Sequence, residues 1–185
     1  MSRIVTYCAF YAAEPFNPGA LGAHATKDFC YYNLLRSWKG SDSSFPFADA
    51  HATTYSVRDG SDWEKTLKPR LRERMRLSKN MVLFLSSNTL NSRALREELD
   101  YGINDQGLPI IAVYPEYDTK ESLLNNGSLK PKIRELWSNL PVFRDSLQKV
   151  PTLHVPMKKE LIRSALADTD FMLATKTTPK VYLFS

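Results

Sequence analysis

The stretch from Asn80 to Ile103, NMVLFLSSNTLNSRALREELDYGI, decides the fold of this chain. It opens with Met81 to Leu85, a short and unbroken apolar run. Such a run is typical of a strand that is covered on both faces in a parallel sheet. The residues that follow supply side-chain acceptors for a turn and a helix N-cap: Ser86, Ser87, Asn88 and Asn91. A helix that begins near Asn91 therefore starts just beyond the carboxyl end of a strand, where open α/β sheets bind ligands.

This helix carries two adjacent carboxylates, Glu97 and Glu98, which the helical phase separates. At about 100° per residue, one apolar stripe should face the sheet. The stripe consists of Leu95, Leu99, Gly102 and Ile103. Glu98 falls about 85° from the centre of the stripe, at the border of buried and open surface, whereas Glu97 points nearly opposite. Glu98 is therefore the candidate to serve a cleft. The alternative is that both are solvated carboxylates with Arg93 or Arg96 as intrahelical partners.

A length of 185 residues with 43% apolar and 24% charged residues fits one globular domain, so we expect a single domain over residues 1–185. No run approaches the roughly 18 apolar residues of a membrane span. The N-terminus lacks a signal-peptide pattern, so the sequence predicts a cytoplasmic protein without membrane contact. Cys8 and Cys30 belong to no CxxC motif or Cys/His cluster, so a metal site is not expected.

The net charge of +5 is concentrated between Lys65 and Lys79, where Glu73 is the single carboxylate among many cations. This segment could attract a polyanion or a phosphate-bearing ligand, but a solvated helix face is the interpretation that we favour. Nucleic-acid binding is not expected. The sequence has no zinc-finger spacing, no exposed aromatic platform motif and no recognition-helix pattern.

Strand-like and helix-like segments alternate along the chain. Besides 81–85, strands are expected at Arg3–Tyr11, Phe45–Ala48, Leu108–Tyr114 and Thr152–Val155. Helices are expected at 27–39, from Ser61 to Leu77, from Asn91, at 131–137 and at 157–167. Pro69 either kinks the second helix or sits in the first turn of a new one, and Pro115 to Leu129 is expected to be a loop. The alternation predicts an α/β, three-layer sandwich around a central, mainly parallel sheet of about five strands.

Three segments carry a resemblance to a known family. Residues 6–11 (TYCAFY) are similar to a first-strand box with aromatic residues, and 47–50 (FADA) to a second-strand end that opens a BB loop. Residues 85–98 (LSSNTLNSRALREE) are similar to a strand, a serine–asparagine turn and a W-C-x-x-E helix. These are features of the TIR (Toll/interleukin-1 receptor) superfamily. The chain more closely resembles the bacterial TIR-like proteins of the Thoeris anti-phage system, the ThsB type, which implies a flavodoxin-like/TIR-like sandwich.

The resemblance implies an enzyme that binds NAD as its substrate, breaks the bond between nicotinamide and ribose, and needs no further cofactor. In that family the glutamate that ends the W-C-x-x-E pattern is catalytic, and the matching position here is Glu98. The Trp-Cys pair is Ala94-Leu95 in this sequence, which removes an aromatic wall near the site. A carboxylate near the ribose hydroxyls can orient the sugar and stabilise the oxocarbenium-like charge that develops as the bond ionises.

Further residues are candidates for substrate binding. Aromatic side chains of the first loop would stack on nicotinamide or adenine: Phe10, Tyr11 and Phe16. Side chains around the second loop would contact ribose or pyrophosphate: Asp49, His51 and Arg58. Ser86, which follows the central strand, completes the set. Each has a core or surface explanation as well, since Phe10 suits a buried position and His51 an ordinary loop position.

Water as the acceptor would give ADP-ribose, whereas an internal hydroxyl would give a cyclic ADP-ribose isomer. The Thoeris resemblance implies that such a product diffuses to a separate effector and activates it. Self-assembly is also expected, because TIR enzymes commonly need it to complete the site. The alternative is a non-catalytic adaptor that acts through protein–protein contacts. A receiver-like module ranks lower, because the positions of its acidic cluster and phosphoacceptor hold Phe10-Tyr11 and Phe84-Leu85.

Overall fold

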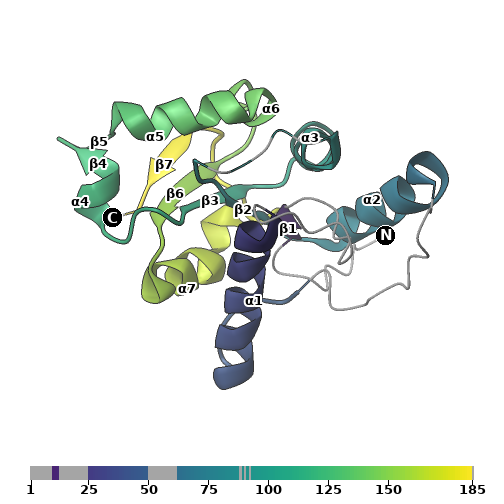
Figure 1. The fold of residues 1–185 in the computed structure, drawn as a ribbon, viewed down its shortest axis with the longest axis horizontal. Coiled ribbons are helices and arrows are strands. Elements are labelled where there is room, and N and C mark those ends of the chain that lie inside the picture. The colour runs from purple at the N-terminus through teal and green to yellow at the C-terminus, as the bar shows by residue number, and fades with distance from the viewer. Residues whose placement is uncertain are drawn as a thin grey trace.

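The computed structural model describes residues 10–12, 25–49, 62–87, 89, 91 and 93–184. Their centre is a five-stranded sheet in the order β1-β2-β3-β6-β7, with every neighbouring pair parallel (Figure 1). The strands are β1 (Phe10–Ala12), β2 (Met81–Phe84), β3 (Ile110–Tyr114), β6 (Thr152–Pro156) and β7 (Val181–Leu183). The predicted α/β class and parallel sheet of about five strands are confirmed.

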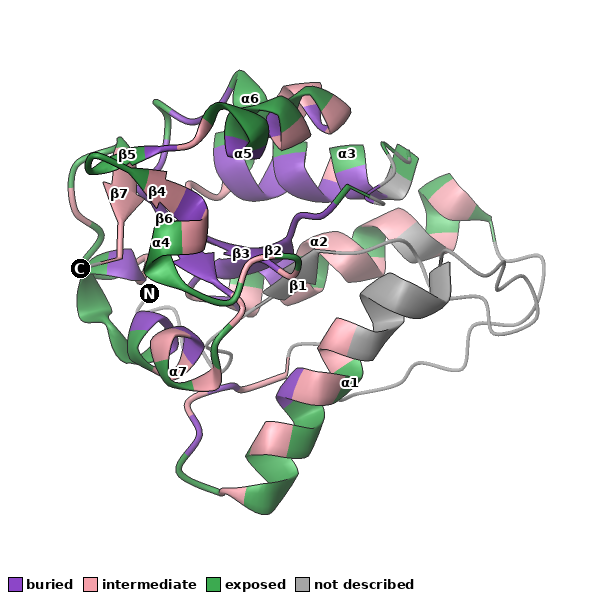
Figure 2. Ribbon diagram, turned by 60° about the vertical axis from the view of Figure 1, so that its left-hand side comes forward, coloured by how far each residue is buried: buried purple, intermediate pink, exposed green. Residues whose placement is uncertain are grey.

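Helices cover both faces of the sheet (Figures 1 and 2). One face carries α1 (Ala25–Ser41) and α7 (Lys159–Ala167), and the other carries α3 (Arg93–Asp100), α5 (Pro131–Leu136) and α6 (Pro141–Arg144). Side chains of β2 alternate between the two hydrophobic clusters: Val82 and Phe84 pack on the α1/α7 side, and Met81 and Leu83 on the α3 side. Because both faces are covered, all residues of β2, β3 and β6 are buried, as the unbroken apolar runs of β2 and β3 predict.

The second predicted helix is two elements. A π-helical turn, η2 (Trp63–Leu67), is followed by α2 (Lys68–Leu77), which flanks α3 and buries Met75 in the same cluster as Leu99. Pro69 lies in the first turn of α2, where its missing N–H costs no helical hydrogen bond. The N-cap of η2 is Asp62, whose carboxylate accepts from the Lys65 amide at 2.9 Å. The predicted start of this helix, Ser61, lies outside the described residues.

The segment between β3 and α5 is more regular than the predicted loop. It holds a short helix, α4 (Lys120–Leu123), capped by Thr119, and an antiparallel hairpin of β4 (Leu124–Asn125) and β5 (Ser128–Leu129). The two residues at the hairpin tip, Asn126 and Gly127, have positive φ angles of 48° and 75°. Asn-Gly is the sequence that favours this tight turn. Each hairpin strand has only two residues, too few to give an alternating pattern.

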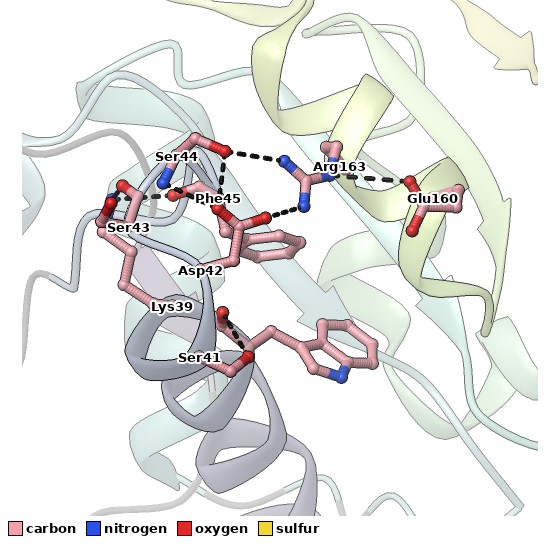
Figure 3. Close-up of polar contacts among 9 residues, drawn as sticks. Lys39, Ser41, Asp42, Ser43, Ser44, Phe45, Glu160 and Arg163 are labelled. Carbon is pink, nitrogen blue, oxygen red and sulfur yellow. Dashed lines mark hydrogen bonds and ion pairs between the residues drawn. The ribbon is translucent and has the colours of Figure 1, made fainter.

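Phe45–Ala48 was predicted as a strand, and this prediction is wrong. Phe45 and Phe47 are buried beside α1 and α7 as part of an irregular segment. The polar contacts in Figure 3 explain its shape: Asp42 accepts from the amide and the hydroxyl of Ser44, and Lys39 donates to the carbonyl of Phe45 at 2.8 Å. Pro46 has no N–H to donate to a ladder. The fifth strand is β7 instead, three half-buried residues that the sequence did not predict.

Arg163 of α7 fixes the same segment from the other side (Figure 3). Its guanidinium donates to the Asp42 carboxylate and, at 3.3 Å, to the Ser44 hydroxyl. The guanidinium carbon also lies 5.3 Å from the centroid of the Phe45 ring. Hydrogen bonds from Ser44 and Arg163 hold the pKa of Asp42 well below its ordinary value. The chain that leaves α1 is therefore clamped to α7. Within the described residues, every helix is too short or too polar to cross a membrane.

Candidate active site

A polar turn leads from the carboxyl end of β2 into α3 and also contacts the chain just after β3. The amide of Ser86 donates to the Thr89 hydroxyl at 2.9 Å, and the Thr89 amide returns a bond to the Ser86 carbonyl at 3.1 Å. Just after β3, the carboxylate of Glu116 accepts from the hydroxyl of Ser87 and, at 3.3 Å, from its amide. The predicted strand, turn and helix are all present, with α3 beginning at Arg93. Glu116 was not singled out in the sequence, although it follows a strand directly.

The helix α3 continues into a π-helical segment, η3 (Tyr101–Asp105). The predicted stripe is confirmed over both, because Leu95 and Leu99 of α3 and Gly102 and Ile103 of η3 are all buried. Glu98 lies deeper than the phase predicts: its residue is 2% exposed rather than at the border of the surface. The helical phase predicts which residues of α3 face the sheet, but it does not show which other elements pack against the helix. In the structure α3 also contacts α6 and β1, while Arg72 of α2 reaches its outer flank. A position at the edge of the stripe is therefore enclosed.

Glu97, the neighbouring carboxylate, is held by α2. Its Oε1 accepts from Nη2 of Arg72 at 2.5 Å and from Nε at 3.1 Å, and its Oε2 lies 3.4 Å from Nζ of Lys68. These hydrogen bonds raise the pKa of Arg72 above its ordinary value. The predicted intrahelical partners are wrong, because Arg93 pairs with Glu64 and Arg96 donates to the carbonyl of Asn91. Glu97 is thus engaged in the packing of two helices.

A groove of about 520 Å³ lies between α2 and the start of η3. The residues that line it are Glu64, Lys68, Pro69, Arg72, Arg76 and Tyr101. The guanidinium of Arg72 stacks over the Tyr101 ring with its carbon 4.5 Å from the ring centroid. Among the residues described, Glu98 is not part of this lining. The groove is a charged surface feature beside the candidate catalyst.

The remaining site candidates divide by location. Asp49 accepts a 2.6 Å hydrogen bond from the Tyr32 hydroxyl and lies 3.8 Å from Nε of Arg36, so its carboxylate faces α1. Burial, with help from Asp49, raises the pKa of Tyr32. Ser86 is buried in the turn before α3. Phe10 and Tyr11 lie in β1, beside Met81 and Val82, but their side chains are outside the described residues, as are all of Phe16, His51 and Arg58.

One polar cluster in the core was not anticipated. The Tyr114 hydroxyl lies between Nδ1 of His154, at 2.7 Å, and the indole N–H of Trp137, at 2.9 Å. Burial lowers the pKa of His154 to about 3. A histidine in the middle of the apolar strand TLHVP was the available signal, because a buried imidazole needs a polar partner. In the part of the chain that is described, His, Cys, Asp and Glu side chains form no group of three that could hold a metal ion.

A comparison with protein families agrees with this architecture. The model of the Thoeris protein ThsB, TIR-like domain, matches residues 7–120. The match covers more than half of the chain and spans β1, α1, α2, β2, α3 and β3, including Asp49, Ser86 and Glu98. The parallel sheet and the strand, turn and helix of the candidate site are those that the resemblance implied. The chain therefore belongs to the TIR-like ThsB family of the Thoeris anti-phage defence system.

Proposed function

We propose that this protein is an NAD-cleaving enzyme of anti-phage defence. It releases nicotinamide and forms ADP-ribose or a cyclic ADP-ribose isomer, which activates a separate effector. The observation that carries the proposal is the placement of Glu98, which is buried on a helix just beyond the carboxyl end of a central strand. The resemblance implies that the glutamate at this position is catalytic. Glu97 is paired with Arg72 and Lys68 between α2 and α3, so its carboxylate serves the packing of these two helices.

The chemistry suits a single carboxylate. In NAD the nicotinamide ring carries a positive charge, so when the C–N bond breaks, the bonding electron pair leaves with the ring and neutralises it. The ribose becomes oxocarbenium-like and is then attacked by water or by a hydroxyl of the same molecule, which loses its proton. A buried carboxylate stabilises this developing positive charge more strongly than an exposed one, because the surroundings screen it less. Glu98 would supply that stabilisation.

We assign substrate binding to β1, to the loops that follow β1 and precede α2, and to the turn before α3. Phe10, Tyr11 and Phe16 would stack on the nicotinamide or adenine ring. His51 and Arg58 would contact ribose or pyrophosphate, and Ser86 would contact the sugar from the turn before α3. The hydrogen bond from Tyr32 gives Asp49 a second role, which is to anchor the start of the second loop to α1. The protein would act in the cytoplasm, with self-assembly completing the site.

The test is the reaction of purified protein with NAD, followed by mass spectrometry of the nucleotides, with and without lysate from infected cells. Wild type should release nicotinamide, and Glu98→Gln should release at least about 100-fold less. Glu135→Gln is the matched control, because Glu135 is an exposed carboxylate on α5. Circular dichroism checks that each variant is folded. Release by Glu98→Gln at the wild-type rate, or no release by folded wild type under either condition, would overturn the proposal.

A non-catalytic adaptor is the second candidate, and the 2% exposure of Glu98 is the observation that favours it. A carboxylate so deeply buried can serve the packing of α3 alone. The two functions separate in a phage-infection assay. An adaptor keeps full protection with Glu98→Gln, provided that the variant accumulates to the wild-type level, whereas the enzyme loses it.

A further inference from the structure

The cationic side chains that line the groove beside α2 all form ion pairs with carboxylates. Arg72 is bound to Glu97, and Lys68 lies between Glu97, at 3.4 Å, and Glu64, at 3.3 Å. Arg76, further along α2, pairs with Glu73 at 2.6 Å. A groove whose lining cations are neutralised in this way is a poor site for an anionic ligand. The pairs themselves, and what they hold in place, are the more informative feature.

Five of these side chains form a continuous series of alternating charge, which we name the ion-pair ladder: Arg93, Glu64, Lys68, Glu97 and Arg72. The ladder crosses from α3 to η2 and α2 and back to α3, so it joins the two helical segments at more than one point. Side-chain exposure falls from 68% for Arg93 to 20% for Glu97 and is 38% for Arg72, so Glu97 is the least exposed member of the ladder. Because less exposed pairs are less screened by solvent, Glu97 is the strongest point of the ladder.

Arg72 makes a second contact on the same side of the helix that carries Glu97. Its guanidinium stacks on Tyr101, which lies four residues after Glu97 and three after Glu98. Tyr101 is the first residue of η3, which follows α3 directly, and those spacings place it between the two glutamates on the helix surface. Arg72 therefore touches the helix surface that separates Glu97 from Glu98, while the stripe that contains Leu99 holds the opposite side against the sheet.

We propose that Glu97 is a positioning residue: held by Arg72 and Lys68, it fixes the rotation of α3 about its axis and so keeps Glu98 turned toward the reacting sugar. This inference rests on the proposed function. The geometry makes the effect large, because a rotation of about 10° moves a carboxyl about 6 Å from the helix axis by about 1 Å. A misplacement of about 1 Å can cost a reaction about 100-fold in rate.

Glu97→Gln tests the proposal, and Glu73→Gln is its matched control. Both variants remove one carboxylate that pairs with an arginine of α2, but the pair of Glu73 and Arg76 stays within α2. For nicotinamide release, Glu97→Gln should lower kcat about tenfold while KM stays within about twofold of wild type, because Glu97 does not touch NAD. Glu73→Gln should keep both constants. Raising the ionic strength to about 0.5 M should lower kcat of wild type toward that of Glu97→Gln and leave Glu97→Gln unchanged.

A second pair of variants keeps the test decisive if Glu97→Gln folds poorly. Arg72→Lys keeps the charge but loses the two-point hydrogen bond and the stacking on Tyr101, so its kcat should fall between those of wild type and Glu97→Gln. The exchange Arg72→Glu with Glu97→Arg should recover part of the kcat that each single substitution loses.

The outcomes separate this proposal from the one on which it rests. If Glu97→Gln and Glu73→Gln have equal kcat while Glu98→Gln is inactive, the positioning role is overturned and NAD cleavage stands. If folded wild type releases no nicotinamide with or without infected-cell lysate, NAD cleavage is overturned and the positioning role falls with it.

Discussion

The hydroxyl of Tyr114 lies 2.7 Å from Nδ1 of His154, and this contact joins β3 to β6 inside the core. Trp137 donates its indole N–H to the same hydroxyl oxygen. The hydroxyl hydrogen is then directed to Nδ1, which makes Nδ1 the acceptor and places the ring proton of a neutral imidazole on Nε2. Among the described residues, Nε2 has no hydrogen-bond partner. A neutral histidine is what this environment tolerates, because a charged ring would be buried without a counter-ion.

The stability of the protein should therefore fall as the pH is lowered from about 6.5, the ordinary pKa of histidine. Burial lowers the pKa of His154 to about 3. Between about pH 6.5 and about pH 3 the imidazole is therefore protonated in the unfolded chain but neutral in the folded protein. The free energy of unfolding should decrease by up to about 1.4 kcal/mol per pH unit in this window from this residue alone. Urea unfolding at pH 7, 6 and 5 measures the slope.

The variant His154→Gln identifies the source of that slope. Its side chain carries an oxygen that can accept the Tyr114 hydroxyl but does not titrate. Although the variant is less stable at pH 7, its free energy of unfolding should fall less steeply between pH 6 and pH 5 than that of wild type. Identical slopes for the two proteins would assign the pH dependence to other groups.

The clamp between α1 and α7 should respond to acid in a lower range. The pKa of Asp42 lies below its ordinary value, first because of the Ser44 hydroxyl and then because of Arg163. A depressed carboxyl pKa stabilises the fold above about pH 4 and loses this effect as the pH falls further. Asp42→Asn should thus lower the thermal midpoint at pH 7, and its difference from wild type should shrink at pH 3.

Asp145→Asn is the control for that experiment. Asp145 pairs with its chain neighbour Arg144 at 2.7 Å, and both side chains are exposed, so the pair joins no separate elements. Arg144 lowers the pKa of Asp145 as well, but solvent screens this exposed pair, so its removal should lower the midpoint at pH 7 much less than Asp42→Asn does. A loss as large as that of Asp42→Asn would mean that net charge, rather than the clamp to α7, sets the midpoint.

Patterns within a short stretch of sequence predicted much of this fold. The apolar run of β2, the polar turn and the stripe of α3 each depend on residues close together in the chain, and all three are present. Glu98 was selected by its phase on one helix and by its match to the family motif. Its depth was not predictable in this way, because α2 and α6 are folded against α3 by residues far away in the sequence.

The same reason accounts for the errors. Phe45 and Phe47 alternate as strand residues do, but the contacts of Asp42 with Ser44 and Arg163 fix the chain in another shape. The partners of Glu97 were sought on its own helix, whereas Arg72 lies 25 residues earlier in the chain. β7 has three residues and so no pattern of its own; its pairing with β6 makes it a strand.

Gly102 should not tolerate even a methyl group. A Cβ at this position would overlap with Sδ of Met81 and lie 3.1 Å from its Cε, and Met81 is fully buried at the start of β2. The methionine would have to move within a close-packed core, so Gly102→Ala should lower the free energy of unfolding by about 1–2 kcal/mol. Chemical denaturation measures this change.

Two further variants decide whether the contact with Met81 is the cause. Gly40→Ala, in α1, meets no atom within 4 Å and should stabilise the protein by up to about 1 kcal/mol through helix propensity. In the double variant Gly102→Ala with Met81→Val, the shorter side chain has no δ or ε atom to overlap with the new methyl group, so the combined loss should be smaller than the sum of the two single losses. If the losses add, or if Gly102→Ala is as stable as wild type, the helical segment that contains Gly102 does not need this close approach to β2.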